Sequence, residues 1–579
     1  MKAQIFRKIA TCALRSSTAK PNIIAAALLL ASCGTGGTEY FLASSGERTV
    51  ALQSFDDSGM PHIVAELPRG TAVTLCSEKG LTFGGKRYAK VEAGRQKAYV
   101  AREALVRSAG ECVSEKRMFV RTPASVISDP ETSCIGGLAG KGDELTIEGY
   151  DSLCPDGSVY RYRVSFNGSE GYIYGKYLVH DRDMALERYM ADVYDPIHRA
   201  VKNPFNGGEA AGCDFYPVER PSIEGNVMPE SCYSLYLTSS PIVLDNIEAY
   251  ISLAKRTKIN TFVITVKDNE SPGYKAEAMK RHSPTSYEKA NEGNAARYEH
   301  AVRRLHEEGF YVVGRITCFK DSYYVADHID AALTDLATGA PFKYNKAYWP
   351  SAYDRKVWQY NIELAKETVR RFGFDEINLD YVRFPELSIK AEKEVNYRNA
   401  YSESKVQAIQ RFVAYACDEI HAAGAYVSVD VFGESANPGY TTAYGQYWPA
   451  LSNVADVMCG MPYPDHFSNG YYGITKPWNH PYELLSAWGR HVQQRQAETP
   501  TPARVRTWVQ AYNVMRFVDP NGIAYDAENV EKEIRALFDA GLTGGYMPWM
   551  SSANINKYEQ QEAAFNIDYL AEKRGSAGK

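Results

Sequence analysis

The sequence predicts an α/β protein whose C-terminal part is a (β/α)8 TIM-like barrel and whose N-terminal part contains two small all-β barrels. In the C-terminal part, stripes of apolar residues at helical spacing alternate with short apolar runs typical of strands. A glycine follows several of these helices, where it supplies the left-handed cap before the next strand. The 579 residues, 45% of them apolar and 23% charged, suit a globular chain with several domains.

The N-terminal segment, residues 1–32, is interpreted as a lipoprotein signal peptide. Its charged residues are all basic, and the apolar run Ile23–Ala31 is too short to span a hydrocarbon core of roughly 30 Å. Leu30-Ala31-Ser32-Cys33 resembles a bacterial lipobox, which implies a lipid on Cys33. We therefore expect an exported protein, lipid-anchored at the periplasmic or cell-surface face of a bacterial membrane, with residues 33–48 as a flexible tether.

Charge and cysteine content narrow the partners and the compartment. A formal net charge of −5 argues against nucleic acid as the main partner, because phosphate binding requires a basic surface. Cysteines lying close together in the sequence are typical of disulfide-bonded small domains in exported proteins. The expected pairs are Cys76/Cys112, Cys134/Cys154 and Cys213/Cys232. Neither Cys-x-x-Cys nor His-x-x-x-His spacing occurs, so we expect no metal site and no cofactor.

Residues 49–110 and 115–182 form a diverged internal repeat. In each, a glycine turn precedes an alternating strand, a tyrosine-containing strand follows, and a short third strand ends before a leucine. This order of features resembles bacterial SH3-like domains, which implies two small antiparallel barrels that either contact the cell wall or act as spacers. Residues 183–230 are predicted to form a linker of short helix and loop.

The large barrel is predicted over residues 231–572. Its strands are expected to begin near Leu235, Phe262, Tyr311, Ile377, Val427, Val457, Val505 and Gly545. Eight strand-and-helix units in about 340 residues favour a closed barrel. An open doubly wound sheet is the alternative, but no Gly-x-Gly-x-x-Gly or phosphate loop follows a strand.

Polar residues gather where the predicted strands end, and that face of such a barrel carries the active site. With a period of two, Asn378 and Asp380 face the barrel axis from the fourth strand, and Ser428 and Asp430 from the fifth. Two carboxylates therefore enter one pocket from adjacent strands. Paired Asp or Glu residues that flank a glycosidic bond perform glycoside hydrolysis, one as nucleophile or base and the other as acid.

Further strand-end residues are candidates for binding the substrate. Basic side chains can hold a carboxylate ionised or bind hydroxyl and acidic groups of a sugar, and aromatic rings can stack on sugar rings. The candidates are Lys267, Asp268, Arg315, Tyr381, Arg383, Tyr463, Asp465, His466, Gln510 and Trp549, with Trp349 and Tyr512 as further aromatic residues. Lys267 and Asp268, together with Lys320 and Asp321, are also compatible with a salt-bridged rim that has no catalytic role.

Several segments resemble a family of glycosyl hydrolase-like domains of unknown function that is common in bacterial envelope proteins. The resemblance covers most of residues 231–570 and is carried by Leu235–Thr238, Thr265–Asp268, Gly314–Ile316, Phe319–Asp321, Gly373–Ile377, Leu379–Pro385 and Val429–Gly433. It implies a barrel distantly similar to α-amylase- and α-galactosidase-type enzymes, whose nucleophile is the aspartate that ends strand four, here Asp380. The acid varies in position among such relatives, so Asp430, Asp465 and Glu434 all stay open.

These observations together predict a monomeric, lipid-anchored glycoside hydrolase that acts on an envelope or extracellular polysaccharide. Asp380 is expected as nucleophile or base, Asp430 as the general acid with a pKa raised by the negative neighbour, and Arg383 as the residue that orients Asp380. The alternative from another class is a non-catalytic glycan-binding lipoprotein with a degenerate barrel. A metal-dependent deacetylase is disfavoured, because the sequence lacks a histidine pair.

Overall fold

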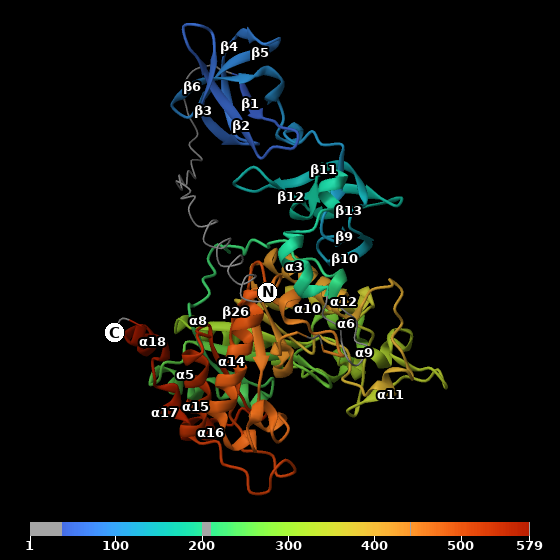
Figure 1. Cartoon of the computed structure of the whole chain (residues 1–579), viewed down its shortest axis with the longest axis vertical. Coiled ribbons are helices and arrows are strands. Elements are labelled where there is room, and N and C mark those ends of the chain that lie inside the picture. The colour runs from blue at the N-terminus through green and yellow to red at the C-terminus, as the bar shows by residue number, and fades with distance from the viewer. Residues whose placement is uncertain (1–37, 200–209, 440–441, 578–579) are drawn as a thin grey trace. The chain divides into compact units, whose positions relative to one another are not determined.

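The computed structural model describes residues 38–199, 210–439 and 442–577. The predicted signal peptide and Cys33 lie outside these residues. The described chain separates into two compact units, one that ends at Glu187 and one that begins at Arg188 (Figure 1). In the part of the chain that is described, no helix is long and apolar enough to cross a membrane.

The first unit begins with a seven-stranded antiparallel sheet. Its strands are β1 (Glu39–Leu42), β2 (Thr49–Phe55), β3 (Pro61–Pro68), β4 (Ala72–Phe83), β5 (Lys86–Ala93), β6 (Gln96–Ala101) and β7 (Leu105–Val106), in the order β3-β2-β6-β5-β4-β1-β7. Side chains alternate between the two faces of each strand, so Leu52, Val73, Val91 and Val100 meet in one apolar core. The sheet starts earlier than the predicted boundary at residue 49, because β1 pairs with both β4 and β7.

A second seven-stranded antiparallel sheet follows and repeats the arrangement. Its strands are β8 (Arg117–Val120), β9 (Ala124–Asp129), β10 (Cys134–Ala139), β11 (Glu144–Leu153), β12 (Val159–Phe166), β13 (Ser169–Tyr174) and β14 (Leu178–Val179). Their order, β10-β9-β13-β12-β11-β8-β14, matches the first sheet strand for strand. The N-terminal unit is therefore all-β up to the short helix α2 (Arg182–Leu186).

A buried ion pair joins the two sheets of this unit. Arg69 Nη1 lies 2.6 Å from Glu115 Oε1, and both side chains are at most 3% exposed. Tyr162 OH donates to the same carboxylate, and Arg69 Nε donates to the carbonyl of Gly157. Burial and the charge of Glu115 raise the pKa of Tyr162 to about 12, so its hydroxyl stays a neutral donor.

The second unit contains a sheet of parallel strands that closes on itself. Its main strands are β15 (Cys232–Leu237), β16 (Thr261–Asp268), β18 (Tyr311–Thr317), β22 (Glu376–Asp380), β24 (Tyr426–Phe432), β25 (Val457–Met461), β26 (Arg504–Val505), β27 (Thr507–Gln510) and β28 (Gly545–Trp549). β26 pairs with β25, β27 pairs with β28, and Arg506 alone separates β26 from β27. This interrupted strand closes the ring, and the sheet is barrel-like, as the sequence predicted.

Helices connect the successive parallel strands. The longest are α5 (Ile247–Lys255), α8 (Asn294–Glu307), α10 (Arg355–Phe372), α12 (Lys405–His421), α14 (Pro481–Ala497) and α15 (Ala527–Asp539). In α10, Asp354 caps the first turn by accepting from Lys356 N, and Gly373 ends the helix with a φ of 82°. The predicted apolar stripe of this helix, represented by Trp358 and Ile362, is buried.

Further elements complete the second unit. They are α3 (Ala191–His198), α4 (Pro241–Asp245), α6 (Glu277–His282), α7 (Pro284–Lys289), α9 (Ser322–Asp327), α11 (Ile389–Glu392), α13 (Trp448–Ser452), α16 (Ile555–Gln560), α17 (Glu562–Phe565), α18 (Tyr569–Ala577), β17 (Ser271–Pro272), β19 (Thr334–Asp335), β20 (Lys343–Tyr344), β21 (Ala347–Tyr348) and β23 (Val395–Asn396). Part of the predicted linker belongs to this unit, because Arg220 donates to the carbonyls of Ser452, Val454 and Thr501.

The three predicted disulfides do not form in this structure, which corrects the prediction. The six cysteines concerned are free thiols. Cys213 packs with Val406 and Tyr447 in one apolar cluster, whereas Cys232 belongs to the cluster inside the barrel-like sheet. The prediction rested on closeness in the sequence, which does not bring these two side chains together.

The Arg69–Glu115 pair is expected to stabilise the first unit. Removing one member of a buried ion pair leaves the other charge uncompensated, so Glu115→Ala should destabilise this unit by about 3 kcal/mol. Hydrogen exchange of the whole chain should show faster exchange in the two β-sheets and unchanged exchange in the barrel-like sheet. Arg48→Ala removes an exposed pair with Asp156 and serves as the control, with an expected effect of about 0.5 kcal/mol. Equal effects of the two substitutions would contradict the account.

Candidate active site

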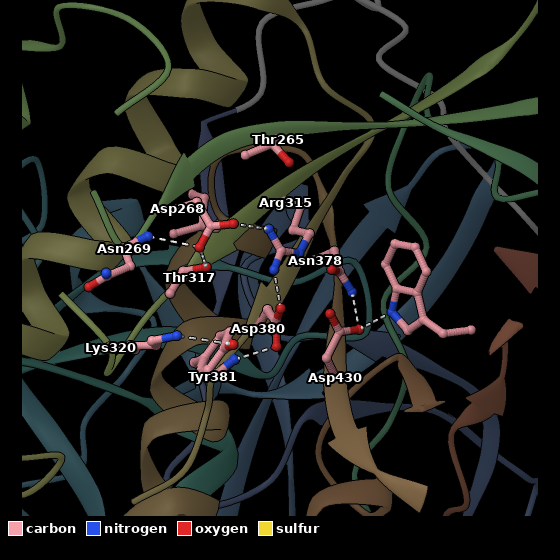
Figure 2. A network of polar contacts seen from close by, with 12 residues as sticks. Thr265, Asp268, Asn269, Arg315, Thr317, Lys320, Asn378, Asp380, Tyr381 and Asp430 are labelled. Carbon is pink, nitrogen blue, oxygen red and sulfur yellow. Dashed lines mark hydrogen bonds and ion pairs between the residues drawn. The ribbon is translucent and has the colours of Figure 1, made fainter. Parts of the chain in front are cut away.

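Charged side chains meet inside the barrel-like sheet at the carboxyl ends of four strands (Figure 2). Asp268 ends β16, Arg315 lies near the end of β18, Asp380 ends β22 and Asp430 lies near the end of β24. Parallel strands bring their carboxyl ends to one edge of a sheet, which explains how residues far apart in the chain form one network.

A β-bulge in β16 decides which of its last residues enters this network. Between Thr265 and Lys267 the register with β18 shifts, so that Lys267 lies opposite Ile316. Val266 is the extra residue, and beyond it the alternation of side chains between the two faces is reversed. Asp268 therefore turns into the barrel, where strict alternation would have placed Lys267.

Lys267 forms a separate ion pair away from the network. Its Nζ lies 2.6 Å from Asp321 Oδ2, and both side chains are 2% exposed. The ammonium group also lies 4.8 Å from the centre of the Tyr360 ring. The structure thus places Lys267 in a buried structural pair, in the manner of the salt-bridge alternative, and not beside the other predicted binding residues.

Arg315 bridges two carboxylates from inside the barrel. Its Nη1 lies 3.3 Å from Asp268 Oδ2, its Nη2 pairs with Asp380 Oδ2, and its side chain is 3% exposed. Burial alone would lower the pKa of Arg315, but the charges of Asp380 and Asp268 raise it well above its usual range. Burial also opposes ionisation of Asp268, yet Arg315 keeps the pKa of that carboxyl below its usual value. A permanent positive charge is therefore fixed between two carboxylates.

Asp430 differs from its neighbours in protonation. Asn378 Nδ2 and Trp508 Nε1 donate to its Oδ1 at 2.8 and 2.7 Å, whereas its Oδ2 is buried without a hydrogen-bond partner in the described chain. Burial and the negative charge of Asp380 raise the pKa of Asp430 well above its usual range. Both effects favour the neutral form of this carboxyl, and Oδ2, the oxygen without a partner in the described chain, could carry the proton.

The backbone leaves the strand direction directly after Asp380. Tyr381 has a φ of 51°, a left-handed conformation that residues other than glycine rarely adopt, and its N–H donates to Asp380 Oδ1 at 2.6 Å. Arg383, which follows this turn, does not contact Asp380 and hydrogen-bonds only the carbonyl of Phe384 among the described residues. The prediction that Arg383 orients Asp380 is therefore wrong, because Arg315 occupies that position.

A second group of predicted residues lies at the ends of β25 and β27. Asp465 accepts from Tyr512 OH at 2.8 Å and from Met515 N at 3.2 Å, and His466 Nδ1 lies 2.9 Å from the same carboxylate. Gln510 Oε1 in turn accepts from Asp465 N. Both oxygens of Asp465 are thus occupied in fixing the surrounding loops.

Aromatic rings lie close to the network. The guanidinium of Arg315 lies 5.2 Å from the centre of the Trp549 ring, and the rings of Trp349 and Tyr381 are 5.8 Å apart. Tyr463 is buried in the apolar cluster inside the barrel-like sheet. Its ring is therefore part of the packing beneath the network.

Two contact residues were missed in the sequence analysis, although a signal for each was present. Trp508 precedes Gln510 by two residues on β27, and the same alternation places it on the inner face where it reaches Asp430. Thr317 follows Arg315 by two residues on β18, and its hydroxyl donates to Asp268 Oδ1 at 3.1 Å.

One group of side chains in the described residues has the composition of a metal site. Suitable ligand atoms of Cys417, His421 and Asp456 all lie within 4.8 Å of one another. However, His421 Nε2 already lies 2.7 Å from Asp456 Oδ2, and the same oxygen accepts from Val427 N at 2.8 Å.

The same arrangement of histidine, aspartate and backbone N–H recurs elsewhere in the unit. His306 Nε2 lies 3.0 Å from Asp375 Oδ2, which accepts from Val312 N at 2.8 Å. In both places the aspartate immediately precedes a strand and ties it to the neighbouring strand and to the end of a helix. The recurrence favours a structural role for the Cys417–His421–Asp456 group.

Solved structures with similarity to this chain include several glycoside hydrolases. The glycoside hydrolase domain of PgaB (BpsB) from Bordetella bronchiseptica is 12% identical, with 58% of this chain and 99% of that chain covered and a TM-score of 0.40. A β-N-acetylhexosaminidase from Bacteroides fragilis is 13% identical, with 60% and 70% covered and a TM-score of 0.39. A hypothetical protein from Ruminiclostridium thermocellum is 29% identical over 34% of this chain and 97% of its own, with a TM-score of 0.29.

The sequence itself identifies the family. No curated protein matches the chain. Residues 234–558, more than half of the chain, match the model of a family described as "Putative glycosyl hydrolase domain". The matched segment runs from β15 to α16 and includes all four charged residues of the network. The chain therefore belongs to this glycosyl hydrolase domain family, as the sequence resemblance predicted.

Proposed function

We propose that the second unit hydrolyses O-glycosidic bonds of an envelope or extracellular polysaccharide. The observation that carries the proposal is a pair of neighbouring carboxyl groups whose surroundings favour opposite protonation states. Asp380 pairs with the buried guanidinium of Arg315, whereas burial and the charge of Asp380 favour the neutral form of Asp430. A charged and a neutral carboxyl side by side are the groups that glycoside hydrolysis requires.

Strand register explains why the two carboxyl groups are neighbours. Asn378 on β22 pairs with Ser428 on β24, and Leu379 pairs with Val429. Asp380 and Asp430 follow at the same level of the sheet, and the negative charge of Asp380 is a main cause of the raised pKa of Asp430. The protonation of Asp430 therefore depends electrostatically on the charge of Asp380.

In the proposed mechanism, Asp380 attacks the anomeric carbon or activates a water molecule that does so, and Asp430 gives its proton to the departing oxygen. When Asp380 forms a bond to carbon, its negative charge is consumed. The influence that raises the pKa of Asp430 then weakens, and Asp430 becomes a stronger acid as the leaving oxygen needs the proton. Arg315 remains charged throughout and holds the position of Asp380.

The other two candidates for the acid are less well supported. Both oxygens of Asp465 accept hydrogen bonds from surrounding groups. Glu434 lies in the turn after β24 and accepts from Tyr444 OH. Asp430 has a raised pKa and a buried second oxygen without a hydrogen-bond partner in the described residues.

For the location, we propose that the protein is exported and anchored by a lipid on Cys33. The support is the basic and apolar sequence that precedes Leu30-Ala31-Ser32-Cys33. The two β-sheet modules would then either contact the cell wall or hold the hydrolase at a distance from the membrane.

Asp380→Asn should lower hydrolysis by about 10³-fold or more, because the substitution removes the charge that the reaction consumes. Release of reducing ends from a panel of envelope and extracellular polysaccharides measures this effect. Asp330→Asn, at an exposed position, is the matched control and should leave hydrolysis unchanged. Hydrolysis that survives Asp380→Asn would remove this residue from the mechanism. Saturable glycan binding without cleavage by the native protein would favour a non-catalytic binding protein.

Asp430→Asn should distinguish the contribution of the general acid from that of the nucleophile. A glycoside with a dinitrophenyl leaving group needs no proton, so its cleavage should survive Asp430→Asn, whereas cleavage of the polysaccharide should fall about 10²- to 10⁴-fold. The native rate should decline as pH rises through the raised pKa of Asp430, and this alkaline limb should be absent for Asp430→Asn on the activated glycoside. If Asp465→Asn or Glu434→Gln shows this pattern instead, that residue is the acid.

The raised pKa of Asp430 also predicts an effect on stability. In the unfolded chain this carboxyl ionises near pH 3.9, but in the folded protein it stays neutral to a higher pH, so rising pH in that window favours unfolding by about 1.4 kcal/mol per unit. Asp430→Asn cannot ionise and should be more stable than the native protein at neutral pH. Urea unfolding should show this difference shrinking as the pH falls toward the unfolded pKa. A difference that is independent of pH would contradict the assignment.

A further inference from the structure

Arg383 lies in an enclosure of aromatic rings next to the candidate active site. Its guanidinium carbon is 4.4 Å from the centre of the Phe432 ring, 5.0 Å from Tyr381, 5.1 Å from Trp349 and 5.6 Å from Tyr444. These residues come from different segments of the barrel-like unit, and only 5% of Arg383 is exposed. The enclosure fixes the planar group while desolvating it, which strengthens electrostatic interactions with any ligand that reaches it.

The charge of Arg383 has no counter-charge in contact with it. Among the described residues it forms no ion pair, and its single hydrogen bond goes to the carbonyl of the next residue. Other buried arginines of this unit differ, because Arg506 pairs with Glu376 and Arg355 pairs with Glu403. A buried charge is costly unless a partner of opposite charge is present. The difference indicates that the partner of Arg383 is supplied from outside the chain.

A second cation without an ion-pair partner in the described chain lies over the ring of Tyr381, which Arg383 also contacts. Lys320 Nζ is 4.8 Å from the centre of the Tyr381 ring and 3.5 Å from its hydroxyl. Tyr381 directly follows Asp380, so both cations lie against the ring of the residue next to the proposed nucleophile in the chain. Arg315, in contrast, is fully engaged by Asp268 and Asp380 and is not available to a ligand anion.

Acidic groups also face this region. Burial and the charge of Glu434 raise the pKa of Glu386, while Arg383 and His466 act on it in the opposite direction. Neither Glu386 nor Glu434 forms an ion pair with Arg383. They therefore do not neutralise the guanidinium directly.

We infer that Arg383 and Lys320 form a subsite for an oxyanion carried by the sugar that binds beside Asp380. The inference rests on the proposed function, and it narrows the substrate class to acidic glycans. The anion is the carboxylate of a uronic acid or a sulfate or phosphate ester, which share the oxygen geometry that a guanidinium fork recognises. The aromatic rings around Arg383 hold the fork in place.

The test compares charged glycans with neutral forms of the same backbone. Titration calorimetry of the whole protein would use oligogalacturonate against its methyl ester, dextran sulfate against dextran, and phosphomannan against mannan. We expect at least one charged member to bind about 10-fold more tightly than its neutral form, with a dependence on salt concentration. The pair that shows this preference identifies the anion. Equal binding within all three pairs, or no binding at all, would overturn the inference.

Substitutions then assign the preference to the subsite. Arg383→Gln and Lys320→Gln should each remove most of the preference for the charged member and leave binding of the neutral member unchanged. Lys343→Gln is the matched control, because Lys343 also lies over a tyrosine ring, 5.2 Å from the centre of Tyr348, outside the subsite. If Arg383→Gln fails to fold, Arg383→Lys keeps the charge without the fork and should retain only part of the preference. A preference that survives in Arg383→Gln, or an equal loss for charged and neutral members, would overturn the inference.

Hydrolysis measured on the same glycans keeps the two proposals apart. Cleavage that depends on Asp380 but shows no charge preference would overturn the subsite and leave the hydrolase standing. A charge preference that depends on Arg383, without cleavage of any glycan, would support the subsite and count against the hydrolase.

Discussion

A buried guanidinium needs negative charge within a few ångströms. The position of Arg315 therefore requires carboxylates close to it, and the arrangement of the site depends on this requirement. Arginine does not lose its proton in proteins, so the two carboxylates in contact with it, Asp268 and Asp380, are held as its counter-ions. Asp430 is a third carboxyl near this cation, and it is buried without an ion pair of its own among the described residues, whereas the side chain of Asp268 is 37% exposed. Burial and the charge of Asp380 raise the pKa of this third carboxyl, which favours its neutral form. The opposite protonation states of Asp380 and Asp430 thus follow from the position of one arginine.

The backbone departs from regular strand geometry at two places, and both shape the site. The bulge at Val266 turns Asp268 into the barrel and sends Lys267 to a separate partner. The left-handed turn at Tyr381 stops the strand after Asp380 and takes Arg383 into the aromatic enclosure. Irregularities of this kind are frequent near functional sites, where local geometry is fitted to a ligand at some cost in regularity.

The same two places explain where the sequence analysis succeeded and where it failed. β22 and β24 are regular up to Asp380 and Asp430, so simple alternation brought Asn378 and Asp430 to the same face, where they hydrogen-bond. The alternation of strands and helices likewise predicted a barrel-like sheet, because long amphipathic helices such as α10 carry a strong periodic signal. The salt-bridge alternative given for Lys267 agrees with its pair with Asp321, whereas the expectation that Arg383 orients Asp380 failed, because a left-handed residue leaves no trace in hydrophobic periodicity. The short strand β1 was missed because its place in the sheet depends on pairing with the distant strands β4 and β7. The cysteine pairs were predicted from closeness in the sequence alone, and the six thiols are free.

The charge balance around Arg315 is the centre of this account, and infrared spectroscopy tests it most directly. Difference spectra between the native protein and Asp430→Asn, with carbon-13 in the aspartate carboxyl groups, report the carbonyl stretch of a protonated aspartic acid. The account predicts that this band is present in the native protein at neutral pH and absent in Asp430→Asn. In Arg315→Met, which removes the cation, the number of protonated aspartic acids should rise. A native protein without a protonated aspartic acid at neutral pH would contradict the account, and with it the pairing of a charged Asp380 and a neutral Asp430.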